Sequence, residues 1–259
     1  MPTATQAPLS SGLAIALLIA SGLAPVLASP IEPAYDWSGW QIGANLGYGF
    51  GPSHIDIAPM SPGAVIRESF VSPRLEDRPS GAMGGLEAGL ARQSRAWVYG
   101  VVADWSPADV KDQVVGPFLQ APFDFRTTDS QRLDQLATLR AKLGFAPWDR
   151  ALVYTTAGLA LGRAHMSTFA IDTSADICGG TIKFCVGGSS EKWLAGFALG
   201  AGSEFALAAN WSLKVEYLYY DLGKTTDTMS DILAPPDVFR GSASIRGDVV
   251  RVGLDYRFR

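Results

Sequence analysis

The sequence has few of the side chains that build metal and nucleophile sites, since its 259 residues include only two cysteines and two histidines. Two cysteines without a nearby histidine do not make a zinc set. No phosphate loop, nucleotide fingerprint or carboxylate-dyad motif is present. Basic residues are not in excess either, because the formal net charge is -4. The electrostatic footprint of a nucleic-acid-binding protein is therefore missing, and we expect neither a cofactor nor a nucleic-acid partner.

Long hydrophobic runs are absent after residue 28. The one apolar run, residues 12–28, consists mostly of Leu, Ile, Ala and Gly and ends in small or apolar residues, which favours a secretory signal peptide over residues 1–28. No Lys or Arg precedes the run, so an N-terminal membrane anchor is the alternative, but the run is short and interrupted by Pro25. Residues 29–259 are then expected to form one domain, either soluble in the exported space or closed into a membrane barrel.

The last segment of the chain alternates strictly in polarity. One parity holds apolar residues that end in two aromatics, namely Val250, Val252, Leu254, Tyr256 and Phe258, and the other holds Val249, Arg251, Gly253, Asp255 and Arg257. A period of two places successive side chains on opposite faces of a strand. An apolar face opposite a charged face with a glycine is typical of a strand with lipid outside and a narrow polar lumen inside.

The same alternation recurs about eight times, in segments of about ten residues that can cross a bilayer at a tilt. These segments are residues 40–50, 85–90, 97–105, 137–145, 151–163, 193–205, 213–220 and 249–259, of which 151–163 is apolar on both parities and leaves its facing open. The connections alternate between short (92–96, 147–150 and 208–210) and long (51–80, 106–130, 164–190 and 223–244). This pattern predicts an all-β fold: a closed up-and-down antiparallel transmembrane β-barrel with short periplasmic turns and long extracellular loops.

Several segments resemble a known family, the small outer-membrane barrel proteins of Gram-negative bacteria of the OmpA-like or opacity-type porin group. The resemblance rests on DWSGWQIGANLGYG (36–49), LRAKLGF (139–145), LVY with GLA (152–154 and 158–160), WSLKVEYLYYDLG (211–223) and GLDYRF (253–258). It implies an outer-membrane location, contact with outer-membrane lipids, and recognition of the terminal aromatics Tyr256 and Phe258 by the assembly machinery. The family usually ends on the aromatic, whereas Arg259 follows here.

The alternation also assigns ten charged side chains to the lumen, five of each sign. They are Arg140, Lys142, Lys214, Arg251 and Arg257, and Glu87, Asp104, Glu204, Glu216 and Asp255. An eight-stranded barrel is only wide enough for side chains to fill it, and buried charges must be paired to be tolerated. We therefore favour a structural ion-pair network that plugs the lumen, with a narrow porin-like channel as the alternative.

Aromatic residues gather at the ends of the expected strands. They are Trp37, Trp40, Trp97, Trp105, Trp148, Trp193, Trp211, Tyr217, Tyr219, Tyr256 and Phe258. Indole and phenol rings favour the headgroup level of a bilayer, so we interpret this set as the two aromatic girdles of a barrel. Sugar stacking or haem contact is the functional alternative.

Cys178 and Cys185 fall in the third long loop with two glycines between them. In an exported protein such a pair favours a disulfide that ties the loop. Metal binding is the rival interpretation, and no nearby histidine supports it.

A lipid-modifying barrel enzyme is a further alternative. His165 and Ser167 would share a face of the fifth strand, as in a lipid A deacylase arrangement, with Glu191 or Asp172 as a third member. Nucleophilic chemistry needs a base, an orienter and an oxyanion site together, and His54 lies in an expected loop without a partner pattern. We therefore predict a protein that is not an enzyme: an envelope structural or surface-interaction protein whose loops could meet an extracellular ligand such as haem, or a host surface.

Overall fold

The computed structural model describes residues 35–66, 71–116, 125–172, 185–231 and 238–258, so the predicted signal peptide lies outside the described residues. The elements in chain order are β1 (Gly39–Phe50), β2 (Ser53–Pro59), α1 (Pro62–Ile66), β3 (Arg74–Asp77), β4 (Ser80–Ser94), β5 (Trp97–Val115), β6 (Phe125–Trp148), β7 (Ala151–Asp172), β8 (Cys185–Ala206), β9 (Trp211–Asp231) and β10 (Val238–Phe258). Within these ranges, no helix is both long and apolar enough to cross a membrane.

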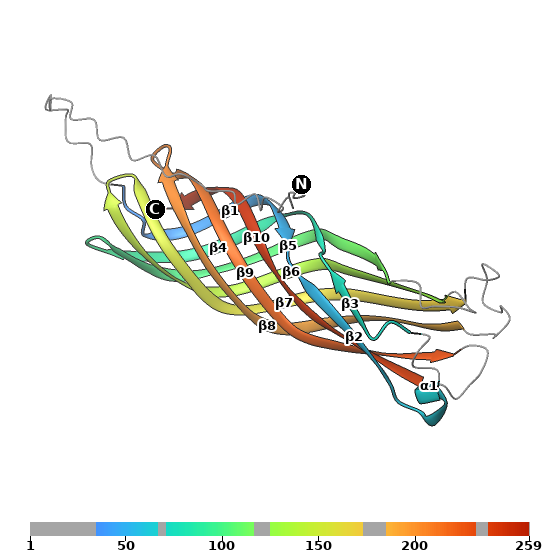
Figure 1. Cartoon of the computed structure of the whole chain (residues 1–259). Coiled ribbons are helices and arrows are strands. Elements are labelled where there is room, and N and C mark those ends of the chain that lie inside the picture. Colours follow the sequence, from blue (N-terminus) through green and yellow to red (C-terminus); the bar gives the residue numbers. More distant parts are fainter. Residues whose placement is uncertain (1–34, 67–70, 117–124, 173–184, 232–237, 259) are drawn as a thin grey trace, which may run out of the picture. The chain divides into compact units, whose positions relative to one another are not determined.

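Eight lines of strand close into a ring. Consecutive strands from β4 to β10 pair antiparallel, and β1 closes the ring by pairing with both β4 and β10. β2 continues the line of β1 along β10, because Phe50 pairs with Asp248 and Ile55 pairs with Ala243. β3 likewise continues the line of β4, because β3 pairs with β2 and β4 pairs with β1. The up-and-down barrel of eight strands predicted from the sequence is confirmed (Figure 1).

Two prolines mark the places where a line of strand is interrupted. Pro52 separates β1 from β2, and Pro79 separates β3 from β4. A proline has no backbone N–H to donate to a ladder. The two interruptions lie side by side, since Gly51 donates its backbone N–H to the carbonyl of Pro79 at 3.2 Å. The interruptions divide the barrel along its length into two parts, one that contains β1 and β4 and one that contains β2 and β3.

We call the part with β1 and β4 the short-turn half, because the turns β4–β5, β6–β7 and β8–β9 lie at its end, and the part with β2 and β3 the long-loop half. The outer face of the short-turn half is apolar on every strand. Its exposed side chains include Trp40, Ile42, Leu46, Leu86, Val101, Leu139, Leu143, Leu159, Phe197, Leu199, Val215, Val250, Val252 and Leu254. The lipid-facing sides predicted from the sequence are correct, and β7 resolves the open case by turning Val153 and Leu159 outward and Tyr154 inward.

In the long-loop half the polarity of the two faces is reversed. Along β5, Trp105 is exposed on the outer face, but beyond it Asp109 and Lys111 are exposed while Ala108 and Val110 are buried. The period of two is unbroken, so only the chemistry of the two faces changes. A polar exterior around an apolar interior suits a barrel that stands in water. The long-loop half therefore lies beyond the lipid.

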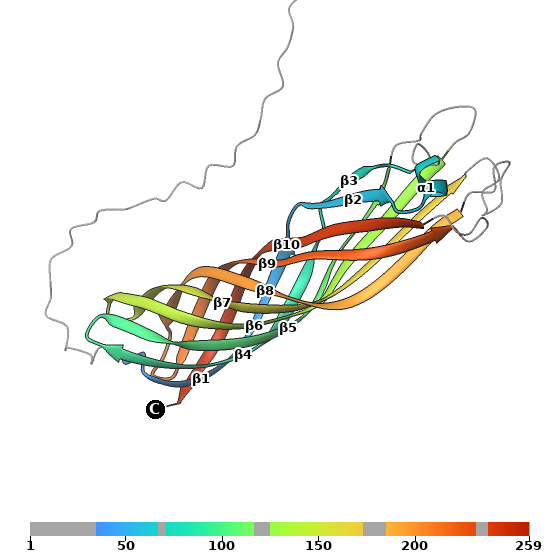
Figure 2. The ribbon, with the colours of Figure 1, turned by 90° about the horizontal axis from the view of Figure 1, so that it is seen from below.

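The strands consequently extend further than the sequence indicated. β5 continues to Val115, β7 to Asp172 and β9 to Asp231, and β8 begins at Cys185, all within segments that were expected to be loops. Figure 2 shows β9 and β10 running as continuous ribbons between the two ends of the barrel.

Candidate functional site: the interior of the barrel

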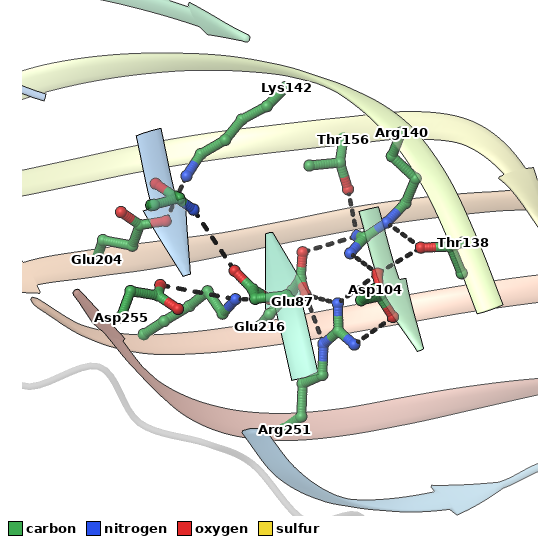
Figure 3. Close-up of polar contacts among 12 residues, drawn as sticks. Glu87, Asp104, Thr138, Arg140, Lys142, Thr156, Glu204, Glu216, Arg251 and Asp255 are labelled. Carbon is green, nitrogen blue, oxygen red and sulfur yellow. Dashed lines mark hydrogen bonds and ion pairs between the residues drawn. The ribbon is translucent and has the colours of Figure 1, made fainter. Parts of the chain in front are cut away.

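Ten charged side chains point into the lumen of the short-turn half. They occupy alternate positions of β4, β5, β6, β8, β9 and β10, and the period of two directs all of them inward. None is more than 6% exposed: Glu87, Asp104, Arg140, Lys142, Glu204, Lys214, Glu216, Arg251, Asp255 and Arg257. These are the ten residues that the alternation assigned to the lumen, and the structure brings them together in two groups (Figure 3).

The first group is a ring of two guanidinium groups and two carboxylates. Arg140 donates from Nη2 to Asp104 and from Nη1 to Glu216, both at 2.8 Å. Arg251 bridges the same two carboxylates, donating from Nε to Glu216 at 2.6 Å and from Nη1 to Asp104 at 3.0 Å. The planar fork of a guanidinium suits such double pairing. The ring joins β5, β6, β9 and β10 across the lumen.

The second group lies nearer the short turns and contains two lysines. Lys142 pairs with Glu204, and Arg257 also contacts Glu204, with 3.4 Å between Nη2 and Oε2. Lys214 pairs with Glu87 and has its Nζ 3.7 Å from Oδ2 of a further carboxylate, that of Asp255. Each of these cations therefore contacts a buried anion from another strand.

The interior of this half is electrically balanced, because the ten groups comprise five cations and five anions. An unpaired charge would carry a large desolvation penalty inside a barrel, and pairing offsets that penalty. The side chains that carry the charges also occupy the cross-section between the strands. The arrangement therefore holds the strands together and fills the lumen at the same time.

Glycines on the inner face leave room for these long side chains. A Cβ added at Gly43 would lie 1.8 Å from Oδ1 of Asp255. One added at Gly200 would lie 2.5 Å from the hydroxyl of Thr156 and 3.1 Å from Nη1 of Arg140. A Cβ at either position would have to displace one of these side chains, so the two glycines leave room for the network in its present arrangement.

A small apolar cluster seals the lumen at the short-turn end. Trp37 is fully buried there with Tyr35 and Leu152, and its carbonyl accepts a hydrogen bond from Nη1 of Arg257. The backbone N–H of Tyr35 bonds to the carbonyl of Asp149 at 3.1 Å, which ties the segment before β1 to the β6–β7 turn. The prediction that Trp37 belongs to an aromatic girdle is therefore wrong, because the chain turns inward before β1 begins.

A larger apolar cluster fills the lumen of the long-loop half. Its most deeply buried members include Ile55, Leu136, Met166, Met229 and Phe239, contributed by β2, β6, β7, β9 and β10. Among the described residues, the lumen thus passes from an aromatic seal through a charged layer to an apolar core. None of these layers is a water-filled pore of the kind that wide barrels enclose.

Sequence reasoning missed three carboxyl groups in the long-loop half. Asp77 and Asp129 are 1% and 0% exposed, and Asp112 lies next to Asp77 across the gap between β3 and β5. Burial, together with the neighbouring carboxyl group of Asp112, raises the pKa of Asp77 to about 8. Burial likewise raises the pKa of Asp129 to about 6, against the hydrogen bonds from Thr168 and Gln131. For Asp112, the signal in the sequence was the alternation of β5, which continues beyond Trp105 with the apolar residues at even instead of odd positions.

Three residues of the enzyme alternative, His165, Ser167 and Glu191, lie on the outer face of the barrel. His165 and Ser167 share the outer face of β7, as predicted, and His165 stands opposite Glu191 of β8. The carboxylate of Glu191 is engaged by Arg163, whose Nε donates to it at 2.5 Å. His54 lies in β2 rather than in a loop. No group of three metal-binding side chains occurs in the described part of the chain.

Three of the remaining predicted residues, Tyr256, Phe258 and Cys185, lie at the two ends of the barrel. Tyr256 and Phe258 are on the outer face of β10, with ring centroids 5.0 Å apart. Cys185 is buried at the start of β8, and Cys178 lies outside the described residues. The disulfide between the two cysteines stays a prediction.

Comparison with known proteins identifies the barrel. Residues 13–258 match the outer membrane protein beta-barrel domain family. The chain belongs to this family. It is 31% identical over 251 residues to the 31 kDa outer-membrane immunogenic protein of Brucella melitensis, covering 96% of this chain and 94% of that protein. The 25 kDa outer-membrane immunogenic protein of Brucella ovis is 25% identical over 236 residues, covering 90% and 85%. Among solved structures, OprG from Pseudomonas aeruginosa aligns with a TM-score of 0.49 and 14% identity, covering 88% of this chain and 100% of that one.

The protein is thus an outer-membrane β-barrel, homologous to outer-membrane immunogenic proteins. In such barrels short turns face the periplasm and longer connections face outward. We therefore take the short-turn end of this barrel as periplasmic and the long-loop half as extracellular.

Proposed function

We propose that this protein is a closed surface barrel, which anchors and displays its extracellular half without conducting ions and without catalysing a reaction. The observation that carries the proposal is the lumen of the short-turn half, where ten charged side chains at most 6% exposed pair across the interior. An ion crossing this layer would have to replace those pairs one by one in a space that side chains already fill.

The long-loop half supports the display role. A barrel that needed only to span the membrane would end near the level of Trp105, yet the strands continue with a polar exterior and their own apolar core. This construction carries the ends of β5, β9 and β10 away from the lipid on an ordered support. The Brucella relatives are named outer-membrane immunogenic proteins, and a surface-displayed barrel is compatible with that name.

Two smaller assignments belong to the same proposal. The outward rings of Tyr256 and Phe258 at the end of β10 act as the signal recognised by the assembly machinery, and Cys178 bonds to Cys185 to tie the extracellular connection between β7 and β8.

Conductance and surface labelling test the proposal together. Purified protein reconstituted in planar bilayers should show no steady channel, and a large stable conductance would refute the closed lumen. In intact cells, a membrane-impermeant maleimide should label Gln113→Cys on exposed β5 of the long-loop half but not Ser94→Cys at the short-turn end. Ser94→Cys is the matched control, since both sites are exposed and should react once the outer membrane is permeabilised. The opposite labelling pattern would invert the orientation.

A further inference from the structure

The closure of the long-loop half depends on a seam between β3 and β5. β4 pairs with β5 as far as Ser80 and Lys111, beyond which the line continues as β3. In the described part of the chain, β3 has ladder partners only in β2. The edge of β3 and the end of β5 therefore face one another without ladder hydrogen bonds. Side chains must close the barrel at this place.

Two carboxyl groups meet at the start of this seam. The backbone N–H of Arg78 points to both of them, with its nitrogen 2.8 Å from Oδ1 of Asp77 and 3.0 Å from Oδ2 of Asp112. Asp77 is 1% exposed, and its Oδ2 has no hydrogen-bond donor among the described residues. Two ionised carboxylates that accept from one N–H repel each other strongly, and this repulsion favours the retention of one proton by the pair.

No neighbouring cation in the described part of the chain neutralises the two carboxyl groups in place of this proton. Lys111 on β5 is largely exposed and pairs with Asp109 at 3.0 Å. The side chain of Arg78 belongs to an exposed residue, and the next charged group in the interior is the carboxyl of Asp129 on β6. Among ion pairs of the described residues, none includes Asp77 or Asp112. In the short-turn half, by contrast, the buried carboxylates are paired with cations.

We propose that Asp77 and Asp112 form a proton-dependent clasp that holds the β3–β5 seam of the extracellular half closed. In the closed seam the pair retains one proton, whereas in an open seam both carboxyls are hydrated and lose it at ordinary carboxyl pKa values. In the closed form the pKa of Asp77 is raised to about 8. The stabilisation of the closed form by the shared proton is therefore lost gradually as the pH rises from the ordinary carboxyl pKa toward 8. Closure is complete at acidic pH and weakens as pH rises toward 8.

Linkage fixes the size of the effect. When the closed form holds one more proton than the open form, the opening equilibrium rises about tenfold per pH unit. It should therefore increase roughly fiftyfold from pH 6 to pH 8, and it should level off above pH 8 because the closed form then also loses its proton.

Hydrogen exchange on the folded protein in lipid vesicles measures this opening. Exchange of peptides from residues 71–80 and 108–116 is compared with that of peptides from β9 and β10 in the same half, which corrects for the pH dependence of chemical exchange. Asp77→Asn places an amide donor where the shared proton lies, so its seam should stay closed and vary less than about twofold between pH 6 and pH 9. The matched control is Asp109→Asn, an exposed carboxylate on the same strand, which should keep the wild-type profile.

Three results would overturn the proposal. The first is a seam whose relative exchange in the wild type does not change from pH 6 to pH 8. The second is an unaltered pH profile in Asp77→Asn or, if that variant does not fold, in Asp112→Asn. The third is a profile abolished by Asp129→Asn but not by either clasp variant, because the titrating group would then be Asp129. None of these measurements depends on whether the lumen conducts.

Discussion

Replacing Glu216 by glutamine tests the charged layer most directly, because this carboxylate accepts hydrogen bonds from two arginines. Its Oε1 is 2.8 Å from Nη1 of Arg140, its Oε2 is 2.6 Å from Nε of Arg251, and its side chain is 2% exposed. The substitution preserves shape and removes one negative charge. The interior then changes from five cations and five anions to five cations and four anions, and Asp104 alone faces both guanidinium groups.

The expected cost follows from burial. Removing one partner of a buried, hydrogen-bonded pair leaves an uncompensated charge and typically costs about 3–5 kcal/mol. The matched control is Glu191→Gln, whose carboxylate also pairs with an arginine, Arg163, but with side chains 46% and 39% exposed. An exposed pair contributes only about 0.2–1 kcal/mol. The two substitutions are chemically identical and differ only in the surroundings of the charge.

Equilibrium unfolding in denaturant, with the protein in lipid vesicles and tryptophan fluorescence as the signal, measures both free energies. A double variant, Glu216→Gln with Arg251→Gln, restores the balance of charge and should recover part of the loss, which a double-mutant cycle reports as a favourable coupling. If Glu216→Gln were no more destabilising than Glu191→Gln, the luminal charges would be hydrated, and the argument for a closed lumen would fail.

Three further predictions concern the lipid face, the periplasmic seal and the cysteines. Leu139→Arg, at an exposed site on the lipid-facing side of β6, should cost about 2–4 kcal/mol and impair assembly; normal insertion would contradict the assigned faces. Trp37→Ala removes a fully buried ring and should cost about 3–5 kcal/mol in the same unfolding assay, whereas a cost under about 1 kcal/mol would mean that the seal is not packed. Mass spectrometry of unreduced protein should find Cys178 linked to Cys185, and quantitative labelling of free thiols in intact cells would exclude the bond.

The sequence was sufficient for the short-turn half because lipid imposes a sharp chemical contrast. Positions such as Leu139 and Val252 must be apolar, while Arg140 and Arg251 beside them must face the lumen, so the alternation is visible in the residue types alone. The pairings between strands were not visible. That Arg140 meets Asp104 and Glu216 depends on the register of the five consecutive strands β5 to β9, which hydrogen bonds fix and composition does not.

The long-loop half was read as loops because the same alternation continues with its chemistry exchanged. Beyond Pro107 on β5, the apolar residues move from odd to even positions, as in Ala108 and Val110, while Asp109 and Lys111 take the outer face. A search for apolar residues at odd positions of β5 therefore ends at Trp105. The position of Trp37 was predicted wrongly for a different reason. An isolated tryptophan before a strand has the same local sequence pattern whether its ring enters the lumen or the headgroup layer.

The two halves of the barrel are consequently stabilised by different interactions. In the short-turn half, the apolar outer face lies in lipid, and the paired charges inside have no hydrated alternative while the barrel stays inserted. The long-loop half stands in water, so its apolar core competes with solvent as in a soluble domain. It also contains the β3–β5 seam, which lacks a ladder in the described residues. Local opening draws on the least stabilised contacts, so the extracellular half can open at the seam while the membrane half remains closed. A surface barrel of this construction can change its outward face without creating a hole in the outer membrane.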